Sequence, residues 1–174
     1  PEGYFDSVEL MELDTMVGGK GINNPDLVKV LAENSGPAID YLETLGMTIH
    51  NVGAFGGASV KRIHRPVDEN NKVIAVGSYM VPILEKNVND RKNITLLTSV
   101  TADKIEQDDA GNVTGVHALS ADGSQVNVKS KAVIIATGGF AANKEMVEKY
   151  QPSLKGYMST NAAGALGQGI TMAE

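Results

Sequence analysis

The stretch KAVIIATGGFAANKEM, residues 131–146, joins an apolar run to a helix-forming segment through Thr137, Gly138 and Gly139. A continuous apolar run of this kind is typical of a strand that is covered on both faces. Glycines tolerate positive φ and let another group approach the bare main chain. Because ligands of open α/β sheets bind outside the carboxyl ends of strands, this junction is a candidate binding site. A plain strand-to-helix turn is the alternative when the tripeptide is considered alone.

A second polar group follows about twenty residues later, where Thr160 and Asn161 supply side chains that both donate and accept hydrogen bonds. Gly164, Gly167 and Gly169 then leave a flexible main chain that leads into an expected helix. The N-terminus of a helix suits a polar or anionic group. The two groups together favour a binding site over a plain turn.

Four basic side chains, Lys61, Arg62, His64 and Arg65, gather in a glycine-rich segment between residues 46 and 75. This segment has no regular apolar periodicity and is longer than most loops of compact domains, and such loops are often functional. Two interpretations stay open. The cluster is either a solvated surface loop or the lining of a site for an anionic cofactor or substrate.

The three histidines offer little chemistry of their own. His50 is expected to be structural and His117 to be an exposed strand residue, whereas for His64 a structural role and a position facing a cofactor both stay open. None has a metal-ligand spacing with an acidic partner, and the chain has no cysteine. We therefore expect no metal site and assign no catalytic residue.

Helical apolar spacing predicts five helices that would position these residues. The second begins with Asn24 as the cap and Pro25 in the first turn, and Gly36-Pro37 should break or kink it. Val81, Leu84 and Val88 should face inward from the third helix. The five ranges are 7–17, 24–45, 78–89, 143–150 and a helix from about residue 167.

The second half of the chain predicts strands. Residues 93–100 and 132–137 are apolar runs of the buried type. Between them, three shorter strands should form an antiparallel meander, with turns at Asp109-Ala110-Gly111 and at the two-residue hairpin signal Asp122-Gly123. The expected fold class is therefore mixed α/β.

The amino-acid composition further limits the class of protein and its possible partners. The 174 residues are 42% hydrophobic and 21% charged, which is typical of one globular domain. A net charge of −6 argues against nucleic acid as a partner, and no apolar run reaches the ~20 residues of a membrane span. The chain begins at Pro1, so we expect a piece of a longer polypeptide whose exposed apolar surface promotes self-association.

Four pieces of the sequence carry a resemblance to a known family: DTMVGGKGINNPDLVKVL, GGASVKRIHRP, VIIATGGFAANKEMV and PSLKGYMSTNAAGALGQGITMAE. In order and spacing they resemble the flavoprotein of fumarate reductase and succinate dehydrogenase, especially soluble fumarate reductases of the flavocytochrome c type. The resemblance implies that residues 1–174 are a single partial FAD-binding domain with buried strands, a three-stranded antiparallel meander and flanking helices. The family's N-terminal GxGxxG βαβ unit and its capping domain would both be missing.

The resemblance also implies FAD as the cofactor and a dicarboxylate or enoate as the substrate of the parent protein. In the family, hydride passes from reduced flavin to fumarate and an arginine of a part not seen here acts as the acid. The chain alone should therefore be inactive, and its own binding of FAD stays open. Gln168 stands where the family normally has an aspartate. The implied cofactor contacts are Ala102, Thr137, Gly138, Gly139, Thr160, Asn161 and Gln168.

Other functions remain possible on the same scaffold. Relatives reduce urocanate or similar enoates or desaturate ketosteroids, and a non-catalytic α/β module is a third possibility. Soluble members of the family occur in the cytoplasm and beyond the membrane, so the compartment is unknown, with the cytoplasm favoured.

Overall fold

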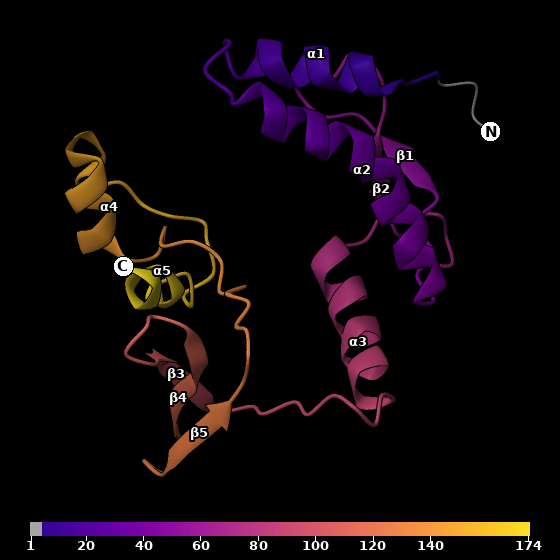
Figure 1. The fold of residues 1–174 in the computed structure, drawn as a ribbon. Coiled ribbons are helices and arrows are strands. Elements are labelled where there is room, and N and C mark those ends of the chain that lie inside the picture. The colour runs from indigo at the N-terminus through magenta and orange to yellow at the C-terminus, as the bar shows by residue number, and fades with distance from the viewer. Residues whose placement is uncertain (1–4) are drawn as a thin grey trace. The chain divides into compact units, whose positions relative to one another are not determined.

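The computed structural model describes residues 5–174 of the chain. The chain divides into two compact units, Pro1–Leu96 and Leu97–Glu174, which are considered separately. In Figure 1 the first unit runs from indigo to magenta and the second from magenta-orange to yellow. Within the described residues, none of the helices combines the length and apolar character that a bilayer crossing requires.

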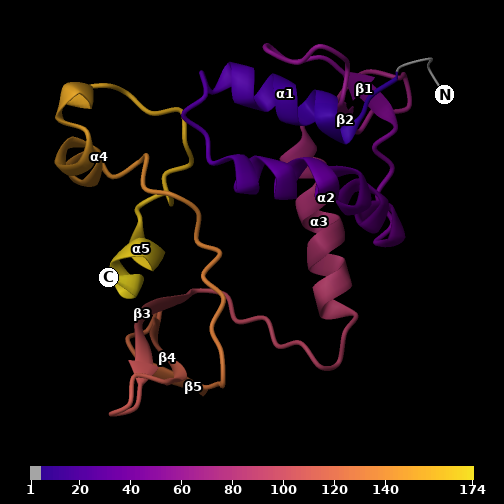
Figure 2. The same cartoon turned by 45° about the horizontal axis from the view of Figure 1, so that its top comes forward.

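Two helices open the first unit, as the sequence predicts, and both are capped. In α1 (Val8–Gly18) the Ser7 side chain accepts a hydrogen bond from the Leu10 N–H, and in α2 (Pro25–Thr44) Asn24 accepts from two N–H groups of the first turn. Such caps satisfy amide donors that have no partner within the helix. The two helices pack against each other and lie side by side in both ribbon views (Figures 1 and 2).

Helix α2 continues through Pro37, so a break at Gly36-Pro37 is wrong. The helix is one element of 20 residues with the proline inside it. Its axis changes direction in its second half, which both ribbon views show (Figures 1 and 2). Proline removes one helical hydrogen bond and crowds the preceding turn, which bends a helix without ending it when the flanking turns hold.

Residues 46–75, which the sequence presents as an irregular loop, contain a small antiparallel hairpin. Strand β1 (Asn51–Gly53) pairs with β2 (Ile63–Arg65). Three of the most buried side chains of this unit, Met47, Ile49 and Pro66, flank these strands. Strands of three residues carry too little alternation to be recognised from the sequence, and their pairing depends on residues about ten positions apart.

Helix α3 (Val76–Asn89) begins two residues earlier than expected and is held by polar contacts. The Tyr79 hydroxyl accepts from the Thr48 N–H at 2.7 Å, and Asn87 Nδ2 donates to the Leu45 carbonyl at 2.9 Å. Two of the side chains expected to face inward, Val81 and Leu84, are exposed. The expected inward face is therefore wrong for these two positions.

The second unit contains the predicted meander. Strands β3 (Val100–Gln107), β4 (Val113–Ser120) and β5 (Gln125–Lys129) form an antiparallel sheet in the order β3-β4-β5. Both turns have three residues, because the Asp108 N–H donates to the Asn112 carbonyl and the Ser120 N–H to the Ser124 carbonyl, with Gly111 and Gly123 at φ +82° and +83°. This is the three-residue hairpin loop that ends in a left-handed residue. The two-residue hairpin expected at Asp122-Gly123 is therefore wrong by one residue.

The two apolar runs predicted as buried strands are not strands in this structure. Residues 93–99 and 132–137 lie outside every sheet, and Ile134 is 92% exposed. A strand needs a neighbouring strand to pair its main-chain groups. None of the described strands pairs with either run, so their apolar residues belong to no sheet.

Three short helical elements complete the second unit. They are α4 (Lys144–Tyr150), the 3₁₀ helix η1 (Pro152–Leu154) and α5 (Gln168–Ala173). Asn143 caps α4 by accepting a hydrogen bond from the Met146 N–H. Helix α4 packs on η1, and α5 packs on β3. The expected helices at 143–150 and from about 167 are thereby confirmed within one residue, and the mixed α/β class is confirmed as well.

Candidate functional site

The end of the apolar run 132–137 presents bare main chain. Gly138 has φ +74°, and a Cβ built on Gly138 or on Gly139 would meet no heavy atom within 4 Å. A hollow of about 380 Å³ lies beside it, lined by Thr137, Gly138 and Gly169 among others. The glycines thus leave room above the main chain, as the sequence predicts for a position that another group approaches.

Gly169 performs a role that the sequence does not reveal. A Cβ on Gly169 would lie 2.1 Å from Thr137 Oγ1 and 2.5 Å from Ile135 Cγ2. A Cβ on Gly167, whose φ is +80°, would lie 2.5 Å from Met146 Sδ. Both glycines are needed for close packing, which differs from the flexible approach to a ligand that the spacing alone indicates.

A second hollow, of about 700 Å³, brings two of the sequence-predicted residues together. Ala102 of β3 and Gln168 of α5 both line it. The same hollow is lined by one cation, Lys144, and two carboxylates, Asp103 and Glu145. The packing of α5 on β3 explains why residues 66 positions apart meet here. The Gln168 amide therefore lies in a mixed but net acidic setting.

Thr160 and Asn161 line a third hollow, of about 690 Å³, formed by α4, η1 and the segment that follows them. The main-chain N–H and Nδ2 of Asn161 both donate to Ser159 Oγ at 3.1 Å. Lys144 lines both this hollow and the previous one. The predicted residues therefore occupy three hollows of one unit, of which the second and third share part of their lining.

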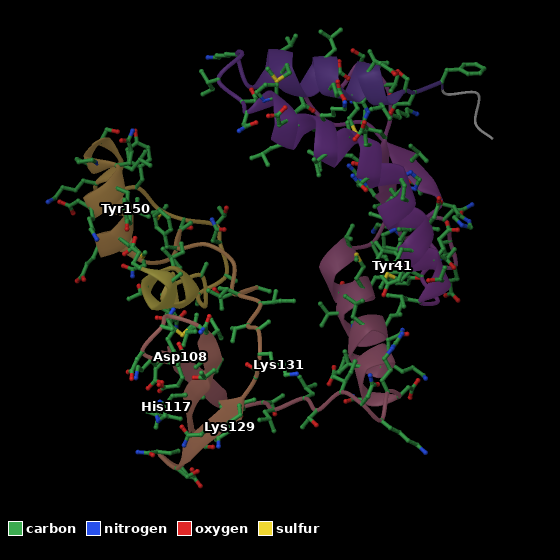
Figure 3. All side chains as sticks on the ribbon, in the orientation of Figure 1. Tyr41, Asp108, His117, Lys129, Lys131 and Tyr150 are labelled. Carbon is green, nitrogen blue, oxygen red and sulfur yellow. The ribbon has the colours of Figure 1, made fainter. Side chains whose placement is uncertain are left out.

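The sequence predicts that His117 is an exposed strand residue, and this prediction is wrong. Its side chain is only 22% exposed, and Nδ1 lies 2.6 Å from Asp103 Oδ1 (Figure 3 labels His117). Asp103 sits at an irregularity where the register shifts from Ala102↔Ala118 to Lys104↔His117. A bulge of this kind re-aims side chains, which brings a carboxylate against the ring.

In the first unit, the basic cluster is divided among different partners. Arg62 donates from Nε and Nη2 to Asp6 and from Nη1 to Asp14, and its side chain is 10% exposed. Contact with Asp6 raises the pKa of Arg62. Two carboxylates thus offset the single Arg62 charge, so an anion-binding role for this residue is not supported.

The same cluster ties the 46–75 segment to α1. Ser59 Oγ and the Ser59 N–H donate to the two Asp14 oxygens at 2.5 and 2.8 Å. Hydrogen bonds from the Ser59 hydroxyl, then its N–H, lower the pKa of Asp14, and Arg62 adds to the effect. The guanidinium of Arg65 lies over Gly53, where a Cβ would come within 3.2 Å of it.

The remaining histidines make local contacts. His64 Nδ1 lies 3.1 Å from the Ile49 carbonyl, and His50 Nε2 lies 2.9 Å from Glu43 Oε1. The expected structural role of His50 agrees with an exposed contact to the end of α2. No group of three or more His, Cys, Asp or Glu side chains among residues 5–174 is arranged to hold a metal ion.

Comparison with known protein families identifies the class of protein that has this fold and these hollows. A family model described as "FAD binding domain" matches residues 2–174. The chain therefore belongs to the FAD-binding-domain family, whose cofactor is FAD.

Three individual proteins show which members of the family this chain resembles. The chain is 44% identical over 169 residues to "Fumarate reductase (cytochrome)" from Shewanella frigidimarina, covering 97% of the chain and 29% of that protein. It is 37% identical over 183 residues to "Urocanate reductase" from Eggerthella lenta, covering 99% and 28%. The solved open conformation of a flavocytochrome c3 fumarate reductase superposes with a TM-score of 0.89 at 32% identity, covering 98% and 29%. The chain thus spans under a third of the length of these relatives.

The chemistry of the three hollows fits a flavin nucleotide. Gly138 and Gly139 offer uncovered main chain, which a flat ring or a pyrophosphate can approach. Thr137, Thr160, Asn161 and Gln168 supply hydroxyl and amide groups that donate and accept. Polar groups of this kind fix the orientation of a cofactor whose bulk is bound by apolar surface.

Proposed function

We propose that this chain is part of an FAD-dependent oxidoreductase that reduces the carbon–carbon double bond of fumarate or a related enoate. The observation that carries the proposal is the 44% identity to a fumarate reductase along 97% of the chain. FAD supplies the hydride chemistry when it is bound, and the protein positions it. What this chain contributes is therefore binding and orientation of the cofactor.

In this proposal the seven sequence-predicted residues share that task. The main chain at Ala102, Gly138 and Gly139 lies against the cofactor, because side chains at these positions are minimal or absent. The side chains of Thr137, Thr160 and Asn161 supply hydrogen bonds at fixed points. Six of the seven residues line one of the three hollows, and the seventh, Gly139, follows Gly138, which lines one.

Gln168 takes the place that the family resemblance gives to an aspartate. Its amide can accept and donate, but it carries no charge. Two carboxylates, Asp103 and Glu145, already line the same hollow. A neutral side chain at 168 avoids a third negative charge there, so we propose that the contact is kept in neutral form.

The domain assignment remains part of the proposal. We propose that residues 1–174 act as one part of a larger FAD-binding domain and that the proton donor and the substrate-binding groups belong to other parts of the whole protein. On this view the 174-residue chain alone does not turn over a dicarboxylate. The 29% coverage of the fumarate reductase supports this division.

The test compares the 174-residue chain with the full-length product of its gene. Each is purified, examined for visible flavin absorbance, and assayed without oxygen for fumarate-dependent oxidation of a reduced viologen dye. We expect flavin and turnover in the full-length protein and no turnover by the chain. A full-length protein that lacks flavin would overturn the cofactor assignment, and turnover by the chain alone would overturn the division of roles.

Urocanate is the second candidate substrate, because a urocanate reductase is 37% identical over 99% of the chain. The same assay distinguishes the two with fumarate and urocanate at equal concentrations. A preference for urocanate of tenfold or more in kcat/KM corresponds to about 1.4 kcal/mol in transition-state binding and would replace fumarate in the proposal.

We also propose that the isolated chain self-associates. Exposed apolar side chains cluster in the runs that form no strand, including Ile94, Leu96, Leu97, Ile134 and Ile135. Apolar surface of this extent tends to be covered by association. Light scattering should report a mass above 18.3 kDa per particle, and a monomer over a hundredfold range of concentration would contradict the proposal.

A further inference from the structure

Helix α5 carries Gln168 as its first residue but has no side-chain cap of its own. The N-cap position is Gly167, which has φ +80° and no side chain that could accept from the first N–H groups. A side-chain cap is the usual device that fixes where a helix begins. At α5 the contacts of the residues just before Gly167 therefore have to fix the first turn.

Two hydrogen bonds from the start of α4 hold these preceding residues (Figure 1 labels both helices). The Ala142 N–H donates to the Ala165 carbonyl at 2.9 Å. Asn143 Nδ2 donates to the Leu166 carbonyl at 3.1 Å. Only one residue separates Leu166 from Gln168, so a hydrogen bond at the Leu166 carbonyl restricts the direction in which the Gln168 side chain leaves the helix.

Close packing transmits this restraint to α5. A Cβ on Gly167 would lie 2.5 Å from Met146 Sδ and 2.8 Å from Phe140 Cβ, so the main chain before α5 touches the side chains around α4. The Asn143 amide nitrogen also lies 3.9 Å from the same sulfur. Because little free space remains at this contact, a change at Asn143 is expected to move the first turn of α5.

The Asn143 side chain uses different atoms for its two polar contacts. Oδ1 accepts from the Met146 N–H at 3.1 Å and caps α4, whereas Nδ2 donates to the Leu166 carbonyl. Serine and aspartate cap a helix about as well as asparagine does. Serine is shorter, however, and an ionised aspartate has no donor, so neither reproduces the second contact.

From these contacts we infer that Asn143 is a positioning residue for the cofactor. It holds the Leu166 carbonyl and thereby fixes Gln168 in the hollow that Asn143, Gln168 and Ala102 line together. The inference rests on the proposed function, because that function assigns the FAD contact to Gln168. It adds a residue that is not among the seven proposed contacts.

Hydrogen–deuterium exchange of the 174-residue chain, read by mass spectrometry, tests the contact without any cofactor. Asn143→Ser keeps a capping acceptor and loses the amide donor. We expect faster exchange in peptides that cover residues 168–173 and unchanged exchange in those that cover residues 144–150, because amides exchange through local opening. Asn143→Asp should give the same pattern, and it replaces the serine variant if that variant does not fold.

Fluorescence quenching of FAD in the full-length protein measures the consequence for the cofactor. Asn143→Ser should weaken FAD binding by about three- to tenfold. Because Asn143 acts through Gln168, the two substitutions should not be additive: in the Gln168→Leu background, Asn143→Ser should cost less than about twofold more. A residue that only stabilised the fold would have the same effect in both backgrounds.

Asn24→Ser is the matched control, since it makes the same substitution at the N-cap of α2. Asn24 accepts from two N–H groups of the first turn, and among residues 5–174 its amide nitrogen donates to no other group. It lines none of the three hollows, nor the separate cavity of about 830 Å³ that lies against α2. The control should leave the exchange of residues 168–173 and the FAD affinity unchanged.

Three results would overturn the inference. These are an unchanged FAD affinity of Asn143→Ser, an equal loss of affinity in both backgrounds, and exchange that rises in residues 144–150 but not in residues 168–173. Failure of the unsubstituted full-length protein to bind FAD would instead contradict the proposed function. The exchange measurements would then still show whether Asn143 holds the start of α5.

Discussion

Gly169 lies so close to Thr137 that a Cβ on the glycine would come within 2.1 Å of the threonine hydroxyl oxygen. This contact joins the first turn of α5 to the end of the apolar run 132–137. It holds Thr137 and Gly138 beside the hollow in which we propose the cofactor binds. The proposed site therefore depends on a glycine whose role is packing.

Gly169→Ala should destabilise the second unit, because the new methyl group overlaps Thr137 and Ile135. Overpacking of this kind costs about 1–3 kcal/mol in free energy of unfolding. Gly139→Ala is the matched control, since its Cβ would meet nothing within 4 Å. Urea unfolding followed by far-UV circular dichroism measures both, and equal stability of the two variants would show that the contact is not maintained in solution.

Gln168→Leu in the full-length protein should weaken FAD binding by about five- to tenfold, because a side chain that can donate and accept becomes apolar. Gln168→Asp keeps acceptor oxygens and should retain more of the affinity than the leucine variant does. Gln151→Leu, at an exposed position that lines none of the three hollows, is the control. Flavin fluorescence quenching gives the dissociation constants, and an unchanged constant for Gln168→Leu would remove this residue from the site.

Arg62→Lys should destabilise the first unit even though the charge is kept. Lysine cannot reproduce the guanidinium fork that donates two hydrogen bonds to Asp6 and one to Asp14. Losing charge-assisted bonds at a side chain that is 10% exposed should cost about 1–3 kcal/mol. The same change at the exposed Arg91 should stay within about 0.5 kcal/mol. Chemical denaturation compares the two, and a larger loss for Arg91→Lys would contradict the assignment.

The meander should lose stability in acid. The Ser124 hydroxyl and N–H lower the pKa of Asp122, and Asn112 does the same for Asp108. Because the folded-state pKa values lie below the unfolded ones, these contacts stabilise the fold above the ordinary Asp pKa of about 3.9. The stabilisation disappears as the pH falls below that value and through the folded pKa.

Asp122→Asn tests this directly, because the amide keeps an acceptor oxygen but does not titrate. The free energy of unfolding should fall further in the unchanged chain than in the variant between about pH 5 and pH 2. An NMR titration of the side-chain carboxyl should also place the Asp122 transition below that of an unstructured peptide. If the free energy of unfolding changed equally with pH in the two proteins, the prediction would be contradicted.

Features that a few neighbouring residues specify could be predicted from the sequence. Asn24 caps a helix that begins one residue later, and Gly111 and Gly123 end the two meander turns. Each such feature depends on hydrogen bonds within about four residues or on the φ of a single glycine. The uncovered main chain at Gly138 belongs to the same class.

Features that need a distant partner could not be predicted. The apolar content of residues 93–99 and 132–137 indicates burial, but a strand exists only where another strand pairs with it. The contacts of Gly169 with Thr137, Asp103 with His117 and Ser59 with Asp14 join residues between 14 and 45 positions apart.

The amino-acid sequence by itself thus determined the starts of α1, α2, α4 and α5 within one residue, the meander, the flavoprotein resemblance and the glycines at the end of the apolar run. Only the tertiary structure decided which glycines pack and which stay uncovered, that Arg62 is paired with two carboxylates, and that a separate cavity lies against α2. The physical reason is the separation along the chain between the groups that interact. Caps and turns are decided by hydrogen bonds between near neighbours, whereas packing, charge pairing and cavities arise from groups that meet only after the chain has folded.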